Sequence, residues 1–239
     1  MQKKKTIGII GGMGPMATAD LFQKIIALID SPDDQGHPRV LIDSNTAIPD
    51  RTAAILHGGP DPLPELIRSA QTLEQAGAQV LVMGCNTAHY YYPQICRHIT
   101  IPFLHMLEES AKAARDSGFQ KVGVLATDGT VRSGVYTQAL ERWGVTQLLP
   151  DEAGQAALME MIYQGVKAGR AVWPAEAVNS LISELADQGA QALLLGCTEL
   201  PIAFDRYHLV SQIPLLDPTW VLARSAVRFS CGEADPLEV

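Results

Sequence analysis

The same nine-residue pattern occurs twice in this chain of 239 residues. GAQVLVMGC (77–85) and GAQALLLGC (189–197) share G-A-Q, a leucine and the closing G-C, and their cysteines lie 112 residues apart. Two further pairs recur in the same order at spacings of 115 and 112 residues: IGIIGGMG (7–14) with VGVLATDG (122–129), and IPFL (101–104) with IPLL (213–216). A general likeness among α/β strands would explain the apolar runs but not the repeated glycine, glutamine and cysteine. The sequence therefore indicates an internal duplication.

Short apolar segments alternate with helical segments. We expect strands at 6–12, 39–45 and 80–85, and helices at about 18–29 and 64–76. The second helix has apolar residues at the i, i+3, i+4, i+7 spacing of an amphipathic helix. The alternation restarts about halfway along the chain. Near-continuous apolar strands that alternate with helices are typical of a parallel sheet with helices on both faces.

The duplication predicts an α/β fold of two similar lobes, each a mostly parallel sheet flanked by helices. We expect the first lobe at 1–103 plus 215–239 and the second at 104–214, because a final helix at roughly 219–229 can pack back on the first lobe. Ligands of open α/β sheets bind outside the carboxyl ends of the strands. Both repeated cysteines end a strand, so we expect the active site in a cleft between the lobes.

The composition narrows the classes of function. Hydrophobic residues make up 47% of the chain, enough for a sizeable core, and the formal net charge is -8. An acidic chain lacks the basic surface that nucleic acids and anionic membranes require, so neither is an expected partner. No long apolar run and no secretory signal is visible, which predicts a cytoplasmic protein whose four cysteines are thiols. None of the cysteines has C-x-x-C spacing, so no metal is expected.

A glycine turn follows the first strand. GGMGP (11–15) lacks the third glycine of G-x-G-x-x-G, because Ala17 stands in its place, so a dinucleotide site has only weak support. The segment is either a tight structural turn or a turn whose backbone N–H groups face an anionic substrate. We favour the substrate turn, with ATDGT (126–130) as its counterpart in the second half.

Cys85 and Cys197 are the strongest candidates for chemistry. Each follows a glycine at a strand end, and a helix N-terminus just beyond would lower the thiol pKa from its usual value of about 8.5. Two symmetry-related thiols suit a racemase or epimerase, in which one removes a proton from a carbon and the other delivers one to the opposite face. The alternatives are one covalent cysteine assisted by His89 or His105, two inert core residues, a redox disulfide, or a metal site with His89.

Two basic residues carry weaker signals. Arg51 lies in NTAIPDRT (45–52), in a loop after a strand, and a guanidinium group can bind a carboxylate bidentately. A single arginine is more often a surface residue. Lys167, judged alone, is a solvated helix lysine. Cys96 and Cys231 lack the repeated glycine, and we expect no function for them.

These motifs resemble those of the cofactor-independent aspartate/glutamate racemase superfamily, and in particular its aspartate racemases. The resemblance spans nearly the whole chain and rests on GGMGP (11–15), NTAIPDRT (45–52), GCNTAH (84–89), ATDGT (126–130) and GCTELP (196–201). GCTE in place of GCTH is unlike the dedicated glutamate racemases. The PDR loop is unlike the hydantoin racemases and the arylmalonate decarboxylases.

The resemblance implies a two-lobed enzyme that needs no pyridoxal phosphate, is commonly a homodimer and acts on a small amino acid, with an acidic one expected. It implies that Cys85 and Cys197 are the acid/base thiols. It also implies that Arg51 and Lys167 hold carboxylate groups. The other implied substrate-binding residues are the GMG turn (Gly12, Met13, Gly14) and Asn86, Thr87, Thr127 and Thr198. Glu199, which follows Thr198, either orients the substrate ammonium or caps a helix.

The predicted function is a racemase that interconverts L- and D-aspartate, with glutamate as the alternative substrate, by proton abstraction and donation between two thiols. A maleate-isomerase-like or decarboxylase-like enzyme with one covalent cysteine is a rival. A two-lobed amino-acid-binding protein without catalysis is another. Retention of both thiols favours the racemase, because binding alone needs neither.

Overall fold

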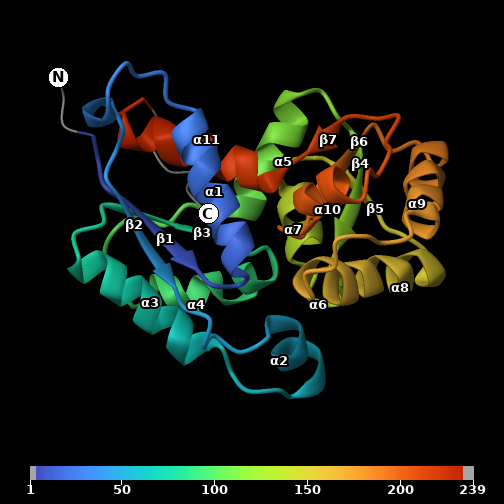
Figure 1. The fold of residues 1–239 in the computed structure, drawn as a ribbon, viewed down its shortest axis with the longest axis horizontal. Helices are drawn as coiled ribbons and strands as arrows, with labels where there is room; N and C mark the ends of the chain where they lie inside the picture. Colours follow the sequence, from blue (N-terminus) through green and yellow to red (C-terminus); the bar gives the residue numbers. More distant parts are fainter. Residues whose placement is uncertain (1–3, 234–239) are drawn as a thin grey trace. The chain divides into compact units, whose positions relative to one another are not determined.

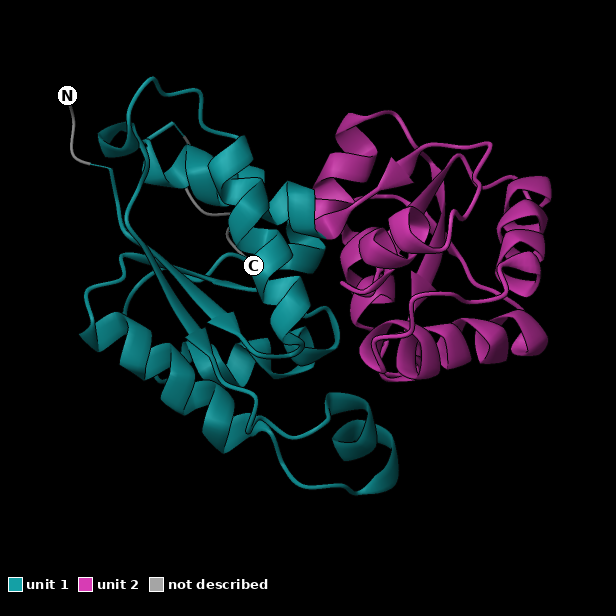
Figure 2. Cartoon of the chain, viewed as in Figure 1, with its two compact units in different colours: residues 1–109, 219–239 teal, residues 110–218 magenta. Residues whose placement is uncertain are grey.

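The computed structural model describes residues 4–233, which form two compact units (Figure 2). Unit 1 comprises the described residues up to Glu109 and from Thr219 onward, and unit 2 comprises Ser110–Pro218. The chain thus leaves unit 1 once and returns to it. The lobe boundaries expected from the sequence, 103/104 and 214/215, lie a few residues from these positions.

Unit 1 contains a parallel sheet of three strands in the order β2-β1-β3 (Figure 1). The strands are β1 (Ile7–Gly11), β2 (Val40–Ser44) and β3 (Val80–Met83). Every residue of β1 and β3 is buried, whereas β2 at the edge is partly exposed. This burial is the reason that β1 and β3 are apolar at nearly every position.

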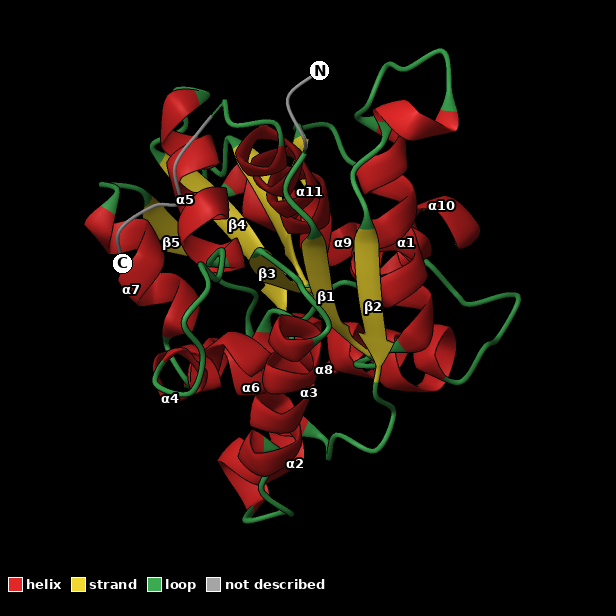
Figure 3. Cartoon of the chain, turned by 90° about the vertical axis from the view of Figure 1, so that its left-hand side faces the viewer, coloured by secondary structure: helices red, strands yellow, loops and turns green. Residues whose placement is uncertain are grey.

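Helices cover both faces of this sheet. Those with residues in unit 1 are α1 (Pro15–Ala27), η1 (Asp34–Gly36), α2 (Arg51–His57), α3 (Leu63–Gln75), η2 (Thr87–Tyr91), α4 (Tyr92–Cys96), α5 (Met106–Asp116) and α11 (Pro218–Ser230). Helices α1 and α11 lie on one face, and α3 and α4 lie on the other (Figures 1 and 3). Leu66, Ala70 and Leu73 form the buried stripe of α3 that its sequence spacing predicts.

Unit 2 contains a parallel sheet of four strands in the order β5-β4-β6-β7. The strands are β4 (Lys121–Ala126), β5 (Thr146–Leu148), β6 (Ala192–Gly196) and β7 (Leu215–Leu216). Its helices are α6 (Asp128–Arg132), α7 (Val135–Arg142), α8 (Glu152–Glu160), the π-helix η3 (Met161–Lys167), α9 (Glu176–Asp187) and α10 (Leu200–Arg206). Leu158 of α8, Leu181 of α9 and Leu193 of β6 belong to one buried core.

The two sheets have the same strand order, so the repeated sequence encodes a repeated structure. Order β2-β1-β3 in unit 1 corresponds to β5-β4-β6 in unit 2. A parallel bridge joins Leu81 to Phe103 in unit 1, and Leu193 pairs with Leu215 in unit 2. Both members of the second pair stand 112 positions after those of the first. The predicted α/β class with two parallel sheets is confirmed.

The repeated glutamine of G-A-Q has a structural role in both units. Gln79 accepts the backbone N–H of Thr6 on its side-chain oxygen at 3.0 Å and donates its own N–H to the Thr6 carbonyl at 2.8 Å. Gln191 makes the same pair of hydrogen bonds with Lys121, at 3.1 and 2.9 Å. Each glutamine lies one residue before a strand and is thus bonded to the residue at, or just before, the start of the neighbouring strand.

The expected elements are present with small shifts at their ends. Helix α1 begins at Pro15, earlier than expected, because proline fits the first turn of a helix. Strand β3 ends at Met83, so Cys85 lies just beyond the strand. Helix α11 is tied to unit 1 by the Ser230 hydroxyl, which donates to the Lys5 carbonyl at 2.6 Å. Within residues 4–233, no helix is both long and apolar enough to cross a membrane.

Candidate functional site

The candidate residues of unit 1 follow the carboxyl ends of its strands. Gly11 at the end of β1 pairs with Ser44 at the end of β2, and Ile10 pairs with Met83 at the end of β3. The GMG turn continues directly from β1, and Cys85 follows β3 after one glycine. Parallel pairing therefore brings these segments to the edge of the sheet at which open α/β sheets bind ligands.

The GMG turn is fixed by close backbone packing. Gly12 has a φ of +88°, and a Cβ atom there would lie 2.4 Å from the carbonyl carbon and oxygen of Asn45. The Thr18 hydroxyl accepts the N–H of Gly12 and donates to the carbonyl of Gly14, each at 2.9 Å. Gly14 precedes α1, so the turn lies at a helix N-terminus, where the helix dipole favours a negatively charged group.

Arg51 is buried beside this turn. It is the first residue of α2, rather than part of the loop that the sequence suggested, and is 8% exposed. Its Nη1 donates to the Pro49 carbonyl at 3.0 Å and its Nη2 to the Met13 carbonyl at 3.4 Å. The side chain of Asp50 caps α2 by accepting the N–H of Ala53 at 2.7 Å. Two of the motifs identified in the sequence thus meet within unit 1.

Cys85 is a buried free thiol, 6% exposed, in a loop of buried polar residues. Asn86, the N-cap of the 3₁₀-helix η2, and Thr87, its first residue, follow directly and are 2% and 7% exposed. The helix N-terminus expected after Cys85 is therefore that of a five-residue 3₁₀-helix, which continues directly into α4. Buried amide and hydroxyl groups next to a thiol can donate hydrogen bonds to a bound carboxylate.

His89 is bonded to the backbone through both of its ring nitrogens. Nδ1 lies 2.8 Å from the carbonyl oxygen of Cys85, and Nε2 accepts the N–H of Met106 at 3.1 Å. A ring held in this way has no nitrogen left to act as an acid, a base or a metal ligand. The geometry therefore argues against the two alternatives in which His89 assists a covalent cysteine or binds metal.

In unit 2, Thr127 and Cys197 follow paired strand ends. Ala126 at the end of β4 pairs with Gly196 at the end of β6, so the next residue of each strand lies at the same edge of the sheet. Thr127 is 4% exposed and caps α6, with its hydroxyl oxygen accepting the N–H of Thr130 at 3.4 Å. Cys197 occupies the position in unit 2 that Cys85 occupies in unit 1.

Glu199 links Cys197 to Lys167. The Cys197 thiol donates to Oε2 of Glu199 at 3.0 Å, and the Thr198 hydroxyl donates to the same oxygen at 3.4 Å. The other carboxylate oxygen, Oε1, forms an ion pair with Nζ of Lys167 at 2.9 Å. Glu199 stands at the N-cap of α10, but its side chain does not cap that helix. Its negative charge lies beside the thiol.

This environment keeps Cys197 protonated. Burial raises the pKa of its thiol well above the usual value, the charge of Glu199 raises it further, and Lys167 acts in the opposite direction. The lowered thiol pKa expected from the sequence is therefore wrong for Cys197. Burial and a neighbouring carboxylate both disfavour the thiolate, and they outweigh a helix N-terminus.

Lys167 ends the π-helix η3, an uncommon element that is often found at functional sites. Its ammonium group lies 5.5 Å from the centre of the Tyr163 ring, and its side chain is 26% exposed. Sequence reasoning alone treated Lys167 as a solvated helix lysine and did not foresee its ion pair with Glu199. The two residues are far apart in the chain, and no local sequence signal joins them.

Two further observations concern the alternatives. All four cysteines are free thiols, and residues 4–233 contain no group of three histidine, cysteine or acidic side chains that could hold a metal ion.

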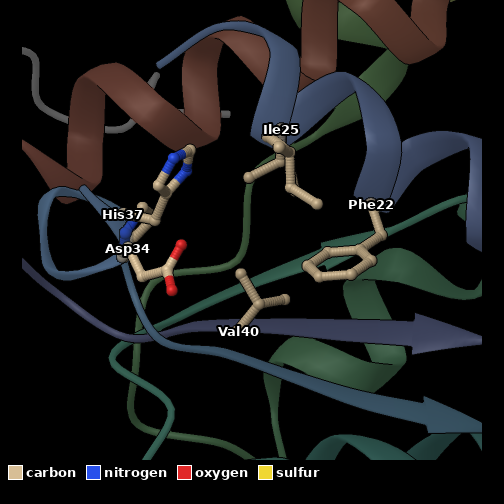
Figure 4. A pocket seen from close by; sticks show the side chains of 7 residues that line it. Phe22, Ile25, Asp34, His37 and Val40 are labelled. Atoms are coloured by element: carbon tan, nitrogen blue, oxygen red, sulfur yellow. The ribbon is translucent and has the colours of Figure 1, made fainter. Parts of the chain in front are cut away.

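A separate hollow of about 300 Å³ in unit 1 is lined by Phe22, Ile25 and Val40, with Asp34 and His37 at one side (Figure 4). Val40 begins β2, so this hollow lies away from the strand ends that carry the candidate residues.

The structure thus contains two similar α/β units, each with a buried free thiol just after the end of an equivalent strand. The chain matches the family described as Asp/Glu/hydantoin racemase over residues 10–226, and it belongs to that family. It is therefore an isomerase of the racemase class.

Individual relatives match along most of the chain. The chain is 29% identical over 225 residues to the broad specificity amino-acid racemase RacX of Bacillus subtilis (strain 168), and the match covers 92% of this chain and 96% of that protein. The solved structure of Picrophilus torridus aspartate racemase superposes with a TM-score of 0.80 at 30% identity, covering 95% of this chain and 94% of the other. A putative Asp/Glu racemase from Yersinia pestis gives 0.79 at 25% identity, covering 95% and 99%.

Proposed function

We propose that the protein racemises an acidic amino acid, with aspartate as its substrate, by proton transfer between the α-carbon and two thiols, Cys85 and Cys197. The observation that carries the proposal is the hydrogen bond from the Cys197 thiol to Glu199, at 3.0 Å. It holds one of the two symmetry-related thiols in the protonated form. A two-base racemase needs one protonated and one ionised partner at any moment.

In the proposed reaction Cys85, as the thiolate, removes the α-proton from one face, and Cys197 gives its thiol proton to the other. One C–H bond breaks and another forms, so neither protons nor electrons are gained or lost. The turnover leaves Cys85 protonated and Cys197 ionised, which is the starting state for the reverse direction. The carbanion-like state is stabilised by hydrogen-bond donors at the α-carboxylate, for which we propose Asn86, Thr87, Thr127 and Thr198.

Arg51 and the GMG turn of residues 12–14 are proposed to bind carboxylate. Arg51 is already oriented by its bonds to Pro49 and Met13, and an oriented guanidinium group loses little entropy on binding an anion. Lys167 would serve a carboxylate in unit 2, where its ammonium group is engaged with Glu199.

Single cysteine substitutions test the proton-transfer mechanism. Cys85→Ser and Cys197→Ser are each expected to lower racemisation of aspartate by at least about a thousandfold, because a serine hydroxyl is a far weaker acid and base at neutral pH. Circular dichroism follows the conversion of each enantiomer. Cys231→Ser, outside the repeated motif, serves as the control and should keep full activity. Near wild-type turnover by either of the first two variants contradicts the mechanism.

Reaction in D₂O separates the rivals. Racemisation by two bases places solvent deuterium at the α-carbon of the enantiomer that is formed. A decarboxylase-like or covalent isomerase reaction gives a different product, which mass spectrometry detects. Tight binding of aspartate without any exchange would instead identify a non-catalytic binding protein.

The two named relatives support different substrate ranges. The likeness to a broad specificity amino-acid racemase favours a wider range, whereas the likeness to an aspartate racemase favours aspartate. Arg51→Ala is expected to lower kcat/KM for aspartate by about a hundredfold and for alanine much less, because a lost charge-assisted hydrogen bond to the side-chain carboxylate costs about 1.5–3 kcal/mol. A panel of amino acids in a chiral assay measures both. Equal losses would show that Arg51 does not bind the side chain.

The remaining proposals rest on the family resemblance and the composition. We propose a cytoplasmic homodimer, and light scattering would then give twice the chain mass of 25.8 kDa.

A further inference from the structure

His89 connects two segments of unit 1 that are distant in the sequence. Its Nδ1 lies 2.8 Å from the carbonyl oxygen of Cys85 and its Nε2 lies 3.1 Å from the backbone nitrogen of Met106. A carbonyl oxygen only accepts and a backbone N–H only donates. The ring must therefore carry its proton on Nδ1 and leave Nε2 as the acceptor, which defines one neutral tautomer.

Each of these two bonds satisfies a group that has a special position. Cys85 lies between the end of β3 and the start of η2, where the chain leaves the regular ladder of the sheet. Met106 is the first residue of α5, and the first N–H groups of a helix have no acceptor within the helix. The imidazole thus ties the loop that carries the thiol to the beginning of a helix.

The orientation of the ring is fixed by its neighbours. His89 is 2% exposed, and its ring centre lies 4.9 Å from that of His105 and 6.1 Å from that of Tyr92, to which it is nearly parallel. Phe103 completes this group at 6.2 Å. A ring enclosed on several sides cannot turn to exchange its two hydrogen bonds without displacing the others.

We propose that His89 is a positioning residue that fixes the Cys85 carbonyl, and with it the direction of the thiol, through a single neutral tautomer. The proposal rests on the use of Cys85 as an acid/base group. His89 itself exchanges no proton with substrate. Burial also lowers the pKa of His89 to about 4, so the neutral ring persists across the neutral pH range.

Three variants test this role. His89→Phe keeps a ring of similar size and removes both hydrogen bonds, whereas His89→Gln keeps one N–H donor and one acceptor. The exposed His98, changed to phenylalanine, is the matched control. The first measurement is kcat and KM for both enantiomers of aspartate. The second is the rate at which iodoacetamide alkylates each cysteine, followed by peptide mass spectrometry.

The expected effects are specific to Cys85. His89→Phe should lower kcat in both directions by at least about tenfold with KM changed less than about twofold, because misplacement of a reacting group by about 1 Å costs rate rather than affinity. The alkylation rate of Cys85 should change by about fivefold or more while that of Cys197 stays the same. His89→Gln should restore most of both properties, and His98→Phe should alter neither.

Several results would overturn the proposal. One is a folded His89→Phe protein with unchanged kcat and unchanged Cys85 alkylation. Another is an equal change in the alkylation of Cys85 and Cys197, which would indicate a general loss of structure. If His89→Phe does not fold, His89→Gln becomes the test. Because glutamine keeps a donor and an acceptor, a tenfold change in the rate of Cys85 alkylation in this variant contradicts the proposal. Alkylation needs no turnover, so failure of the proposed racemase activity would be seen separately.

Discussion

At the scale of the residue, burial and the neighbouring charge of Glu199 together keep a proton on the Cys197 thiol. The Glu199 carboxylate accepts a hydrogen bond from the Cys197 thiol, and its charge is partly neutralised by the ion pair with Lys167. Burial alone disfavours the thiolate, and a carboxylate at hydrogen-bond distance disfavours it further. The ion pair with Lys167, at 2.9 Å, gives the buried Glu199 carboxylate a partner of opposite charge.

We predict that Glu199→Gln lowers the pKa of Cys197 and speeds its alkylation at neutral pH by several-fold. The substitution removes the charge that raises the thiol pKa but leaves the burial, so the pKa stays above its usual value. Lys167→Met is the opposing variant, because it removes the charge that favours the thiolate, and it should slow alkylation. The rate of iodoacetamide reaction at Cys197 as a function of pH gives both shifts. A shift of the same sign in both variants would contradict this electrostatic account.

At the scale of the element, each unit uses a glycine to bring a helix close to its central strand. A Cβ atom at Gly8 of β1 would lie 2.7 Å from Cδ2 of Leu81 and 3.3 Å from Cβ of Leu73 in α3. At Gly123, the corresponding position of β4, a Cβ atom would lie 2.9 Å from Leu193 and 3.2 Å from Leu185 in α9. The repeat therefore preserves a packing contact as well as a strand order.

We predict that Gly8→Ala and Gly123→Ala each lower the free energy of unfolding by about 1–3 kcal/mol, the usual cost of overpacking a core. Urea denaturation measures the loss. Gly84→Ala is the matched control, because its Cβ would meet only Cδ2 of Leu21, at 3.4 Å, and the cost should be smaller. If Gly84→Ala is as damaging as the other two, close helix packing is not the reason for the repeated glycine.

At the scale of the whole molecule, unit 1 is assembled from both ends of the chain, whereas unit 2 is one continuous segment. Helix α11 joins the C-terminal part of unit 1 to its N-terminal part. The N–H of Lys5 donates to the Ser230 carbonyl at 2.9 Å, and the Ser230 hydroxyl donates to the Lys5 carbonyl at 2.6 Å, across 225 positions of sequence. The ammonium group of Lys5 also lies 3.9 Å from the centre of the Phe229 ring.

We predict that Ser230→Ala destabilises unit 1 by about 1 kcal/mol, the usual contribution of one hydrogen bond, and leaves unit 2 unchanged. Hydrogen exchange measured by mass spectrometry should be faster than in the wild type in β1 and α11 and unchanged in β4 and β6. Ser183→Ala in unit 2, which removes an exposed hydroxyl bonded within α9 at 3.0 Å, is the control. Equal loss of protection in both units would show that they do not unfold independently.

The sequence by itself determined the two parallel sheets, most of their strands and the equivalence of Cys85 and Cys197, because periodic burial and a duplicated pattern are written directly in the residue order. The short edge strand β5 (Thr146–Leu148) was not predicted, because it is only partly buried and has no apolar run. The repeated glutamine and glycine positions were visible there too, although their contacts were not. Boundaries moved by a few residues where a proline began a helix or a strand ended early.

Only the tertiary structure decided the contacts that give these residues their chemistry. Glu199 accepts a hydrogen bond from the Cys197 thiol rather than capping α10, and Lys167 forms an ion pair with Glu199 from a π-helix. Both ring nitrogens of His89 form hydrogen bonds with backbone groups. These depend on which side chains from distant segments pack against each other and in which rotamer, which the local sequence does not specify. The pKa of the Cys197 thiol also depended on the tertiary structure. It is raised, because burial and the neighbouring charge of Glu199 outweigh the helix N-terminus that the sequence predicted.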